Sequence, residues 1–321
     1  MKAMVLTAGL GTRLRPLTLE RAKPAIPLLE KPLVVRLITR LLEECITDFR
    51  LNLHHLPNTI ETIFHSRPWR DLPVSFSYES KILGTAGGLK ANESFFDHET
   101  FLMANGDIVM DFSLKEAMAF HRQNQALATL ILYPQSPPYA YYPIRIDKSY
   151  GLRNFKNACP GGDLRPEAYV FTGMHILEPE IFRLIPPGIP WEINDQVYLT
   201  ALKEGARILG FPVEGYWSDL GNPRRYLETQ NELLARMDSP LRRHISSGAA
   251  VSPESVVGHF ASIGDGCVIE AGARIEHSIL WENIRVKKNC SVRNCIIGSD
   301  VIIDRDCSDI VITRNGEAAI V

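Results

Sequence analysis

The feature that most constrains the fold is an aliphatic residue at every sixth position near the C-terminus. Ten positions follow this spacing, with two steps of five: Val251, Val257, Ile263, Ile269, Ile275, Leu280, Val286, Val292, Ile297 and Ile303. Glycine follows three of them, at positions 258, 264 and 298. This period is typical of a parallel β-helix, whose stacked repeats bury one column of aliphatic side chains. We predict a short left-handed parallel β-helix over residues 251–321; ordinary antiparallel strands are the alternative.

The chain before residue 237 has a different pattern, in which short β-rich runs alternate with helical ones. The runs that predict strands are 3–7, 50–53, 74–78, 101–104, 128–132, 168–175 and 207–211. Helices are predicted over 32–45, 57–65, 85–92, 114–123, 196–204 and 223–237. Such alternation predicts an α/β domain with a mostly parallel sheet, whose ligands bind beyond the carboxyl ends of the strands. We assign residues 1–237 to this domain and 238–250 to a linker.

Composition excludes several classes of protein. The formal net charge of the 321 residues is -2, so bulk electrostatics favours neither nucleic acid nor an anionic membrane. No apolar run approaches the roughly 18 residues of a membrane span, and none resembles a signal-peptide core. We therefore expect a cytoplasmic protein. Its six cysteines include no C-x-x-C pair, which predicts reduced thiols, with a Cys290–Cys295 disulfide as the alternative.

A glycine-rich loop follows the first predicted strand. Residues 6–18 read LTAGLGTRLRPLT. Gly9 and Gly11 allow a tight turn that presents bare N–H groups, and Arg13 and Arg15 bring positive charge. The segment predicts a phosphate-binding loop, although a plain strand-to-helix turn is the alternative. It is neither a Walker loop nor a dinucleotide fingerprint, because Leu14 stands where the third glycine of the fingerprint should be.

This loop closely resembles the G-x-G-T-R-L-x-P-L-T signature of sugar-1-phosphate nucleotidylyltransferases. Further family-like motifs follow in order: K-P-x-x-P at 23–27, L-G-T-A-G at 83–87, N-G-D at 105–107, T-G at 172–173, and a G-x-W-x-D-I-G-T-P-like stretch at 215–223. The hexapeptide tail extends the resemblance to mannose-1-phosphate guanylyltransferases with a C-terminal hexapeptide domain. The resemblance implies a Rossmann-like nucleotidyltransferase fold for residues 1–237.

The implied reaction is an in-line displacement, in which a sugar-1-phosphate oxygen attacks the α-phosphorus of a nucleoside triphosphate and pyrophosphate leaves. Asp107 and Asp219 are the implied Mg²⁺ ligands; a turn Asp and a helix N-cap Asp are the alternatives. By the same resemblance, Arg13 holds the departing phosphates and Lys23 bridges the α-phosphate and the sugar phosphate. Arg15 is a weaker candidate that a surface charge would explain equally well.

The same resemblance implies the substrate-binding residues. For the nucleotide these are Leu6, Ala8, Gly9, Gly11, Thr12, Glu79, Gly84, Thr85 and Gly87, with Glu79 either reading the base or standing as an exposed strand-end carboxylate. For the sugar they are Gly173, Glu192 and Asn154. Two departures from the family pattern concern the sugar phosphate: Lys156 matches a Glu-Lys-Pro motif only loosely, and Ile193 replaces the lysine that many relatives carry after the glutamate.

We expect an enzyme that makes a nucleotide sugar, with GTP and mannose 1-phosphate as first choice. Uridylyl or thymidylyl transfer to glucose 1-phosphate or another hexose 1-phosphate is one alternative, and a non-catalytic regulatory subunit that binds nucleotide sugar is another. The β-helix predicts a homo-oligomer. We expect His54 and His55 to be structural. His259 and His277 leave open an acyltransferase site in the β-helix.

Overall fold

The computed structural model describes residues 1–135, 141–153, 155, 163–237 and 240–320. The chain forms two compact units, each made of two segments. The first unit joins Met1–Gly9 to Val34–Ser218, and the second joins Leu10–Leu33 to Asp219–Val321. All five cysteines in the described ranges, including Cys290 and Cys295, are free thiols, which excludes the alternative disulfide.

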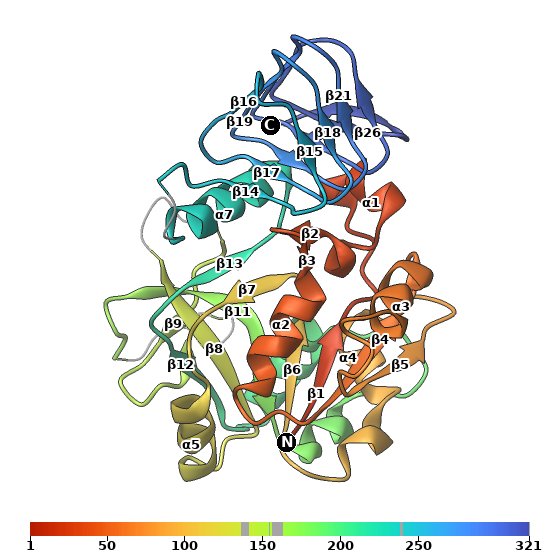
Figure 1. The fold of residues 1–321 in the computed structure, drawn as a ribbon. Coiled ribbons are helices and arrows are strands. Elements are labelled where there is room, and N and C mark those ends of the chain that lie inside the picture. The colour runs from red at the N-terminus through yellow and green to blue at the C-terminus, as the bar shows by residue number, and fades with distance from the viewer. Residues whose placement is uncertain (136–140, 154, 156–162, 238–239, 321) are drawn as a thin grey trace. The chain divides into compact units, whose positions relative to one another are not determined.

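The first unit is built on a seven-stranded sheet with the order β12-β8-β11-β6-β1-β4-β5 (Figure 1). Neighbouring strands pair in parallel, except that β11 is antiparallel to both of its neighbours. The mostly parallel sheet predicted from the sequence is therefore confirmed. Its strands are β1 (Lys2–Leu6), β4 (Asp48–Leu53), β5 (Val74–Tyr78), β6 (Phe101–Asn105), β8 (Ala128–Gln135), β11 (Ala168–Leu177) and β12 (Ile208–Pro212).

The helix over residues 33–42 has the apolar periodicity of a helix that packs one face against a sheet. Its Val34, Leu37, Ile38 and Leu41 side chains are buried, and Leu42 is half-buried. The helices of this unit are α2 (Leu33–Leu42), α3 (Pro57–His65), α4 (Gly84–Lys90), α5 (Lys115–Gln123) and α6 (Tyr198–Lys203). Among the helices in the described ranges, none is long and apolar enough to cross a membrane.

Shorter elements complete the first unit. A stack of Phe96, Phe101 and Phe182 lies in its core, with ring centroids 4.1 and 5.4 Å apart along the stack. Two small sheets pair β7 with β13 and β9 with β10. The bounds are β7 (Ile108–Met110), β9 (Arg145–Ile146), β10 (Leu152–Arg153), β13 (Trp217–Asp219), two 3₁₀ helices (Glu93–Phe96 and Pro179–Leu184) and a π-helix (Ile193–Val197).

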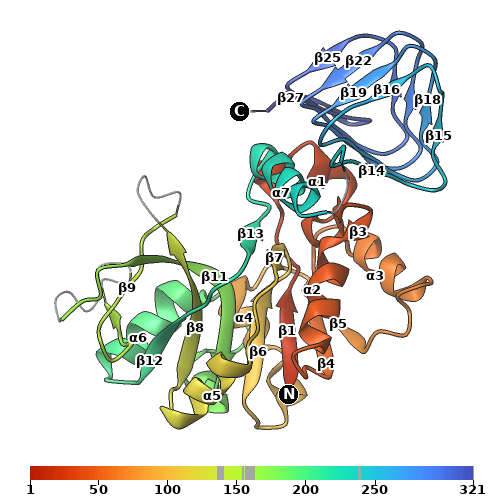
Figure 2. The same ribbon diagram turned by 60° about the vertical axis from the view of Figure 1, so that its left-hand side comes forward.

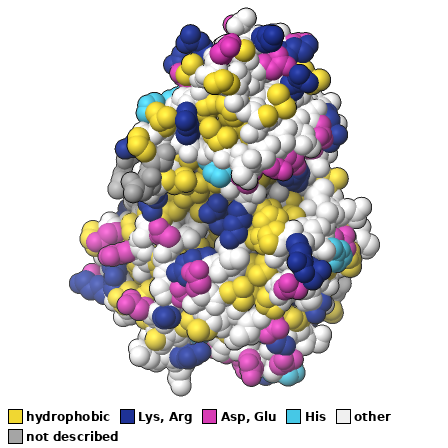
Figure 3. Space-filling view, in the orientation of Figure 1, with side chains coloured by type: hydrophobic (Ala, Val, Ile, Leu, Met, Phe, Trp, Pro, Cys, Tyr) yellow, Lys and Arg dark blue, Asp and Glu magenta, His cyan; other side chains and the backbone are white. Residues whose placement is uncertain are grey.

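The C-terminal part of the second unit is the predicted parallel β-helix. Its coils stack three parallel sheets, which Figure 2 shows as the sides of one prism. From Val257 to Ile303 every residue of the predicted aliphatic column is buried, whereas Val251 is half-buried. The final hairpin is antiparallel. On the face shown in Figure 3, basic and acidic side chains are interspersed over the β-helix.

The β-helix strands are two to four residues long. The first sheet holds β14 (His244–Ile245), β17 (Ser262–Ile263), β20 (Ile279–Leu280), β23 (Ile296–Ile297), β26 (Ile310–Thr313) and β27 (Gly316–Ala319). The second holds β15 (Ala250–Val251), β18 (Val268–Ile269), β21 (Arg285–Val286) and β24 (Ile302–Ile303). The third holds β16 (Val256–Val257), β19 (Arg274–Glu276), β22 (Ser291–Arg293) and β25 (Cys307–Ser308).

The N-terminal segment of the second unit packs with α7 and the β-helix. It contains a 3₁₀ turn (Thr12–Leu14), α1 (Leu17–Glu20), a second 3₁₀ turn (Lys23–Ala25), and the hairpin β2 (Pro27–Leu28) and β3 (Lys31–Pro32). The helix α7 (Pro223–Ala235) begins at Asn222, whose side chain accepts a hydrogen bond from the Arg225 N–H at 2.8 Å. Its Tyr226 hydroxyl bonds the Pro27 carbonyl and accepts from Trp281 Nε1 at 3.0 Å.

Candidate active site

Several predicted nucleotide-binding residues meet at one edge of the seven-stranded sheet. Leu6, the last residue of β1, is in register with Asn52 on β4 and with Asn105 on β6. The loop that carries Ala8 and Gly9 therefore begins beside the segment that carries Asp107. The carboxyl ends of parallel strands are the usual ligand-binding edge of such a sheet.

Glu79 is fixed by a buried network at this edge. Asn52 Nδ2 donates to Glu79 Oε1 at 2.8 Å, and the Leu83 N–H donates to Glu79 Oε2 at 2.9 Å. The Thr7 N–H donates to Asn52 Oδ1 at 2.8 Å, and the Glu79 carbonyl bonds His54 Nδ1. Glu79 is only 6% exposed, so the alternative of an exposed strand-end carboxylate is wrong. Sequence reasoning missed Asn52, because the strand reads DFRLNL and the asparagine fits its alternation of polar and apolar residues.

The start of α4 is joined to the predicted sugar-binding Glu192. The Thr85 hydroxyl donates to Glu192 Oε2 at 2.7 Å, and the Ile193 N–H donates to that hydroxyl at 2.8 Å. A carboxylate at a helix N-terminus is favoured by the helix dipole. Gly84 has a φ of +71°, and a Cβ there would lie 2.5 Å from Glu192 Oε1. The structure thus brings together the L-G-T-A-G segment and Glu192.

A β-bulge places Gly173 near the N-G-D segment. The pairing of β11 with β8 shifts register between Phe171 and His175. Gly173, inside the bulge, has a φ of +85°, and a Cβ there would lie 2.7 Å from Asn105 Nδ2. Both the backbone conformation and the close approach therefore require glycine. The predicted sugar contact Asn154 and the loosely matching Lys156 lie outside the described residues.

In the second unit the glycine loop folds against α1. Gly11 has a φ of +60°, and a Cβ there would lie 2.8 Å from Thr18 Cγ2 and 3.3 Å from Lys23 Cβ. The Thr18 hydroxyl donates to the Gly11 carbonyl at 2.9 Å. Thr12 begins the adjoining 3₁₀ turn, in which Arg13 is exposed. The Thr18 hydrogen bond therefore fixes the loop at Gly11, next to Lys23 Cβ.

Arg13 and Asp219 meet around Gly221. A Cβ at Gly221 would lie 3.3 Å from Asp219 Oδ2 and 3.7 Å from Arg13 Nη1. The bare backbone therefore leaves a space that a methyl group would fill, with a cation and a carboxylate both bordering it. Asp219 is half-buried at the end of β13. Gly221 was not among the predicted site residues.

The chemistry of the candidate metal ligands suits a divalent cation. Asp107 and Asp219 offer hard carboxylate oxygens, and Mg²⁺ usually takes one or two protein carboxylates and keeps several waters. Within the described ranges, no group of three or more His, Cys, Asp or Glu side chains could hold a metal ion. Each carboxylate stands in a different unit.

A buried histidine stands behind the bulge that carries Gly173. His175 Nδ1 lies 2.6 Å from the Tyr198 hydroxyl. Burial lowers the pKa of His175 to about 3, because no solvent is present to stabilise the imidazolium. Burial also raises the pKa of Tyr198 well above its usual value. Both groups are therefore neutral near pH 7 and act as structural supports of the bulge.

Comparison with known proteins decides the family. Residues 2–236 match the nucleotidyl transferase family. This chain belongs to that family. Residues 242–314 match the family described as the GMPPB C-terminal domain, which covers the β-helix. The chain is therefore a nucleotidyltransferase with a C-terminal repeat domain.

Curated relatives extend over most of the chain. A mannose-1-phosphate guanylyltransferase of Mycobacterium tuberculosis is 29% identical over 300 residues, covering 90% of this nucleotidyltransferase and 82% of the relative. Mannose-1-phosphate guanylyltransferase 1 of Arabidopsis thaliana is 26% identical, with coverages of 93% and 86%. A UTP–glucose-1-phosphate uridylyltransferase of Synechocystis sp. is 27% identical, with coverages of 95% and 89%.

Solved structures share the fold. A Bacillus anthracis protein provisionally described as a glucose-1-phosphate thymidylyltransferase aligns with a TM-score of 0.60 at 19% identity, covering 75% of this nucleotidyltransferase and 98% of that chain. HddC of Yersinia pseudotuberculosis aligns with the same TM-score at 20% identity, with coverages of 72% and 99%. These alignments confirm the predicted Rossmann-like nucleotidyltransferase fold.

Proposed function

We propose that this nucleotidyltransferase uses a sugar 1-phosphate as acceptor, and that its first substrates are GTP and mannose 1-phosphate. The observation that carries the proposal is the approach of the Arg13 guanidinium and the Asp219 carboxylate to one point, the Cβ position of Gly221. A guanidinium binds phosphate oxygens, and a carboxylate binds the cation that accompanies them. A site with both groups suits a nucleoside triphosphate with its divalent metal.

The reaction forms one P–O bond and breaks another. A sugar-phosphate oxygen attacks the α-phosphorus, and the bond from that phosphorus to the bridging oxygen of the β-phosphate breaks. The leaving pyrophosphate takes the electron pair. Because both reactants are anionic, the protein contributes mainly positioning and charge neutralisation.

The two positive side chains are proposed to bind different phosphate groups. Arg13, exposed beside the Gly221 space, is proposed to hold the departing β- and γ-phosphates with its fork of N–H donors. Lys23, packed against Gly11, is proposed to bridge the α-phosphate and the incoming sugar phosphate as a compact cation. Both residues stand in the Leu10–Leu33 segment of the second unit.

Asp107 and Asp219 are proposed to hold a divalent cation, with Mg²⁺ as first choice. The bound cation would neutralise phosphate charge. The carboxylates would orient the triphosphate through it, and their half-buried positions limit competition from bulk water.

The first unit supplies the proposed recognition of base and sugar. The Gly84–Gly87 segment and the Gly9 loop offer bare backbone close to the base, while Glu79 stands behind them in its buried network. Glu192 and Gly173 are proposed to contact the sugar. Glu192 is exposed, and its Oε2 already accepts from the Thr85 hydroxyl, so one carboxylate would join the nucleotide and sugar sites.

The choice of guanine and mannose rests on relatives below 30% identity and on the match of the β-helix. Uridylyl transfer to glucose 1-phosphate is the second candidate, because the Synechocystis relative of similar identity bears that name. Backbone groups that read a base edge carry no side-chain signature that separates guanine from uracil.

Pyrophosphate release from the purified chain tests the function. The assay crosses GTP, UTP and dTTP with mannose 1-phosphate and glucose 1-phosphate in the presence of Mg²⁺. We expect release in the GTP and mannose 1-phosphate cell, and loss of that release with EDTA. Folded protein that releases none in any cell would contradict the enzymatic proposal and favour a regulatory subunit that binds nucleotide sugar.

A further inference from the structure

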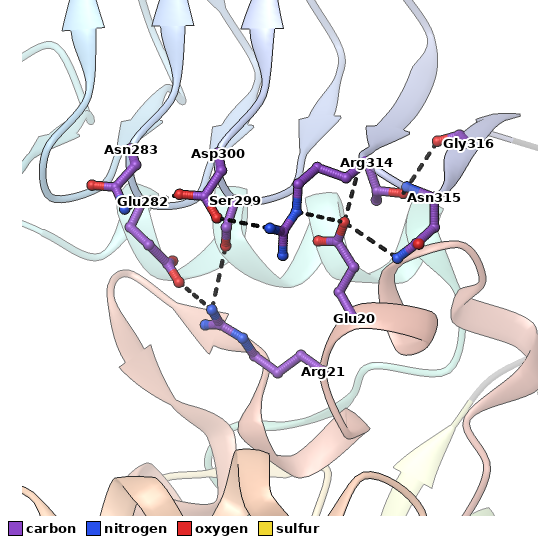
Figure 4. Close-up of polar contacts among 10 residues, drawn as sticks. Glu20, Arg21, Glu282, Asn283, Ser299, Asp300, Arg314, Asn315 and Gly316 are labelled. Atoms are coloured by element: carbon purple, nitrogen blue, oxygen red, sulfur yellow. Dashed lines mark hydrogen bonds and ion pairs between the residues drawn. The ribbon is translucent and has the colours of Figure 1, made fainter.

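One corner of the β-helix faces the segment that follows the glycine loop. Three stacked turns form this corner, at residues 281–283, 298–300 and 314–315, directly after β20, β23 and β26. Figure 4 shows Glu20 and Arg21 reaching this corner from the end of α1. All of these residues belong to the second unit. We call the three turns the corner turns.

Glu20 is buried against the last two corner turns. Its side chain is only 5% exposed. Its Oε1 accepts from the Arg314 N–H at 2.9 Å, and the Arg314 guanidinium lies 3.6 Å away. A Cβ at Gly298 would lie 2.9 Å from Glu20 Oε2. Gly298 has no left-handed φ, so the glycine there serves to admit the carboxylate rather than to allow a turn.

Arg21 contacts the first two corner turns. Its guanidinium pairs with Glu282 and lies 3.3 Å from the Ser299 hydroxyl. It also stacks over the Trp281 ring, 4.9 Å from the centroid. Trp281 is buried and donates to the Tyr226 hydroxyl. The pair is half-buried, so solvent screens it less than it screens an exposed ion pair.

Glu20 and Arg21 are close in the sequence to the proposed phosphate-binding residues Arg13 and Lys23. Glu20 and Arg21 lie within three residues of both Thr18 and Lys23. The Thr18 hydroxyl donates to the Gly11 carbonyl, and Lys23 Cβ lies 3.3 Å from the position that a Cβ on Gly11 would take. A displacement of α1 would therefore move Lys23 and the turn that carries Arg13.

We propose that Glu20 and Arg21 are positioning residues through which the β-helix sets the conformation of the glycine loop. Neither residue is assigned any contact with substrate. The inference rests on the proposed function, because it assigns the loop a role in turnover. The β-helix then contributes to the reaction indirectly. The corner turns fix α1, and α1 fixes the glycine loop in the conformation that binds the triphosphate.

A double-mutant cycle tests the proposal in the full-length protein. The variants are Arg21→Ala, Glu282→Ala and both together. The control is Arg285→Ala, which removes another ion pair of the same β-helix, to Glu270 at 2.7 Å, and involves neither Glu20 nor Arg21. Each variant is assayed for kcat, for KM of the nucleotide, for thermal unfolding, and for amide hydrogen exchange of residues 10–25.

We expect Arg21→Ala and Glu282→Ala each to lower kcat by about 10-fold to 100-fold, because small misplacements of positioning groups have effects of that order. The double variant should lose no more than the worse single variant. Exchange over residues 10–25 should rise in all three, while Arg285→Ala should match the wild type in both readouts. A Glu20→Gln variant keeps the shape of the side chain. Its kcat and its exchange over residues 10–25 should lie between those of the wild type and those of Arg21→Ala.

Two outcomes overturn the proposal. One is wild-type kcat together with wild-type exchange in residues 10–25 for Arg21→Ala. The other is a loss of kcat matched by an equal loss in Arg285→Ala, which would indicate general destabilisation. Failure of the proposed function is distinguishable, because the wild type would then be inactive while the exchange comparison could still be measured.

Discussion

Gly221 organises the proposed reaction centre of the second unit, since Arg13 and Asp219 both border the space above it. We expect Arg13→Ala to lower kcat by about 10³-fold, the order found for arginines that stabilise phosphoryl transfer. Asp219→Asn should cause a loss of similar order. Arg15→Ala is the matched control and should stay close to the wild type. Steady-state kinetics of pyrophosphate release measures all three, and equal losses for Arg13 and Arg15 would contradict the assignment.

His175 predicts a specific dependence of stability on pH. Its folded-state pKa is lowered from 6.5 to about 3 by burial, so between these values the unfolded chain binds a proton that the folded chain does not. Stability attributable to this residue is complete above pH 6.5 and falls as pH falls toward 3, by at most about 1.4 kcal/mol per pH unit.

Urea unfolding between pH 4 and 6 tests this linkage. The His175→Gln variant keeps a group that can bond the Tyr198 hydroxyl but does not titrate. Its free energy of unfolding should therefore depend less steeply on pH than that of the wild type. Parallel pH dependences of the two proteins would show that His175 carries no such linkage.

Sequence motifs make Arg13, Lys23 and Asp219 candidate site residues because each stands in a short family-like segment. Asn52 and Thr18 could not be assigned in this way. Asn52 gains its importance from Thr7 and Glu79, which other strands bring to it. Thr18 is important because its hydroxyl donates to the Gly11 carbonyl, seven residues earlier in the chain. The roles of such residues depend on partners that no local pattern identifies.

The bulge in β11 is the element that places Gly173 beside Asn105. Gly173→Ala should cost about 1–3 kcal/mol of stability, because its φ of +85° strains any residue with a Cβ. It should also raise KM for the sugar phosphate, since the new methyl would lie against the Asn105 amide. Gly188→Ala is the control, with a φ of +74° and no atom within 4 Å. Equal KM values in the two variants would remove Gly173 from the sugar site.

The aliphatic column is the element that stabilises the β-helix. Ile275 is fully buried in it, whereas Ile302 points outward and is 61% exposed. Ile275→Ala should destabilise the protein by about 2–5 kcal/mol, the usual range for truncating a buried isoleucine. Ile302→Ala should change stability by less than about 0.5 kcal/mol. Chemical denaturation compares the two, and similar losses would contradict the inward and outward assignment.

Element boundaries were predictable where local chemistry marks them. The predicted bounds of α3 and β5 match the structure, because Pro57 starts the helix and the Val74–Tyr78 run has strong β propensity. The helix predicted from residue 196 differs, since a π-helix at Ile193–Val197 precedes α6. There the Glu192 N–H bonds the Gln196 side chain, a local contact that periodicity does not encode.

Across the whole molecule, the compact units do not follow the order of the chain. Leu10–Leu33 belongs with the C-terminal part, through contacts such as Arg21 with Glu282, which are 261 residues apart. The six-residue period predicts the β-helix but not what packs against it. Long-range partners of this kind are set by tertiary structure, so the corner turns could not be inferred from the sequence.

Self-association through the β-helix remains a prediction for the whole molecule. We expect light scattering coupled to size exclusion to give a mass that is a multiple of the chain mass at micromolar concentration. A β-helix offers flat faces and coil edges for such contacts. A monomer mass at every concentration tested would contradict this expectation.

The product that the chain makes from a mixture of substrates tests the proposed reaction and its specificity together. One reaction holds equal amounts of GTP, UTP and dTTP with mannose 1-phosphate, glucose 1-phosphate and Mg²⁺, and mass spectrometry identifies the nucleotide sugar formed. We predict GDP-mannose as the main product, formed about 10³-fold more slowly in the same mixture with Asp219→Asn. A uridine or thymidine sugar would contradict the substrate assignment, and the absence of any nucleotide sugar would contradict catalysis itself.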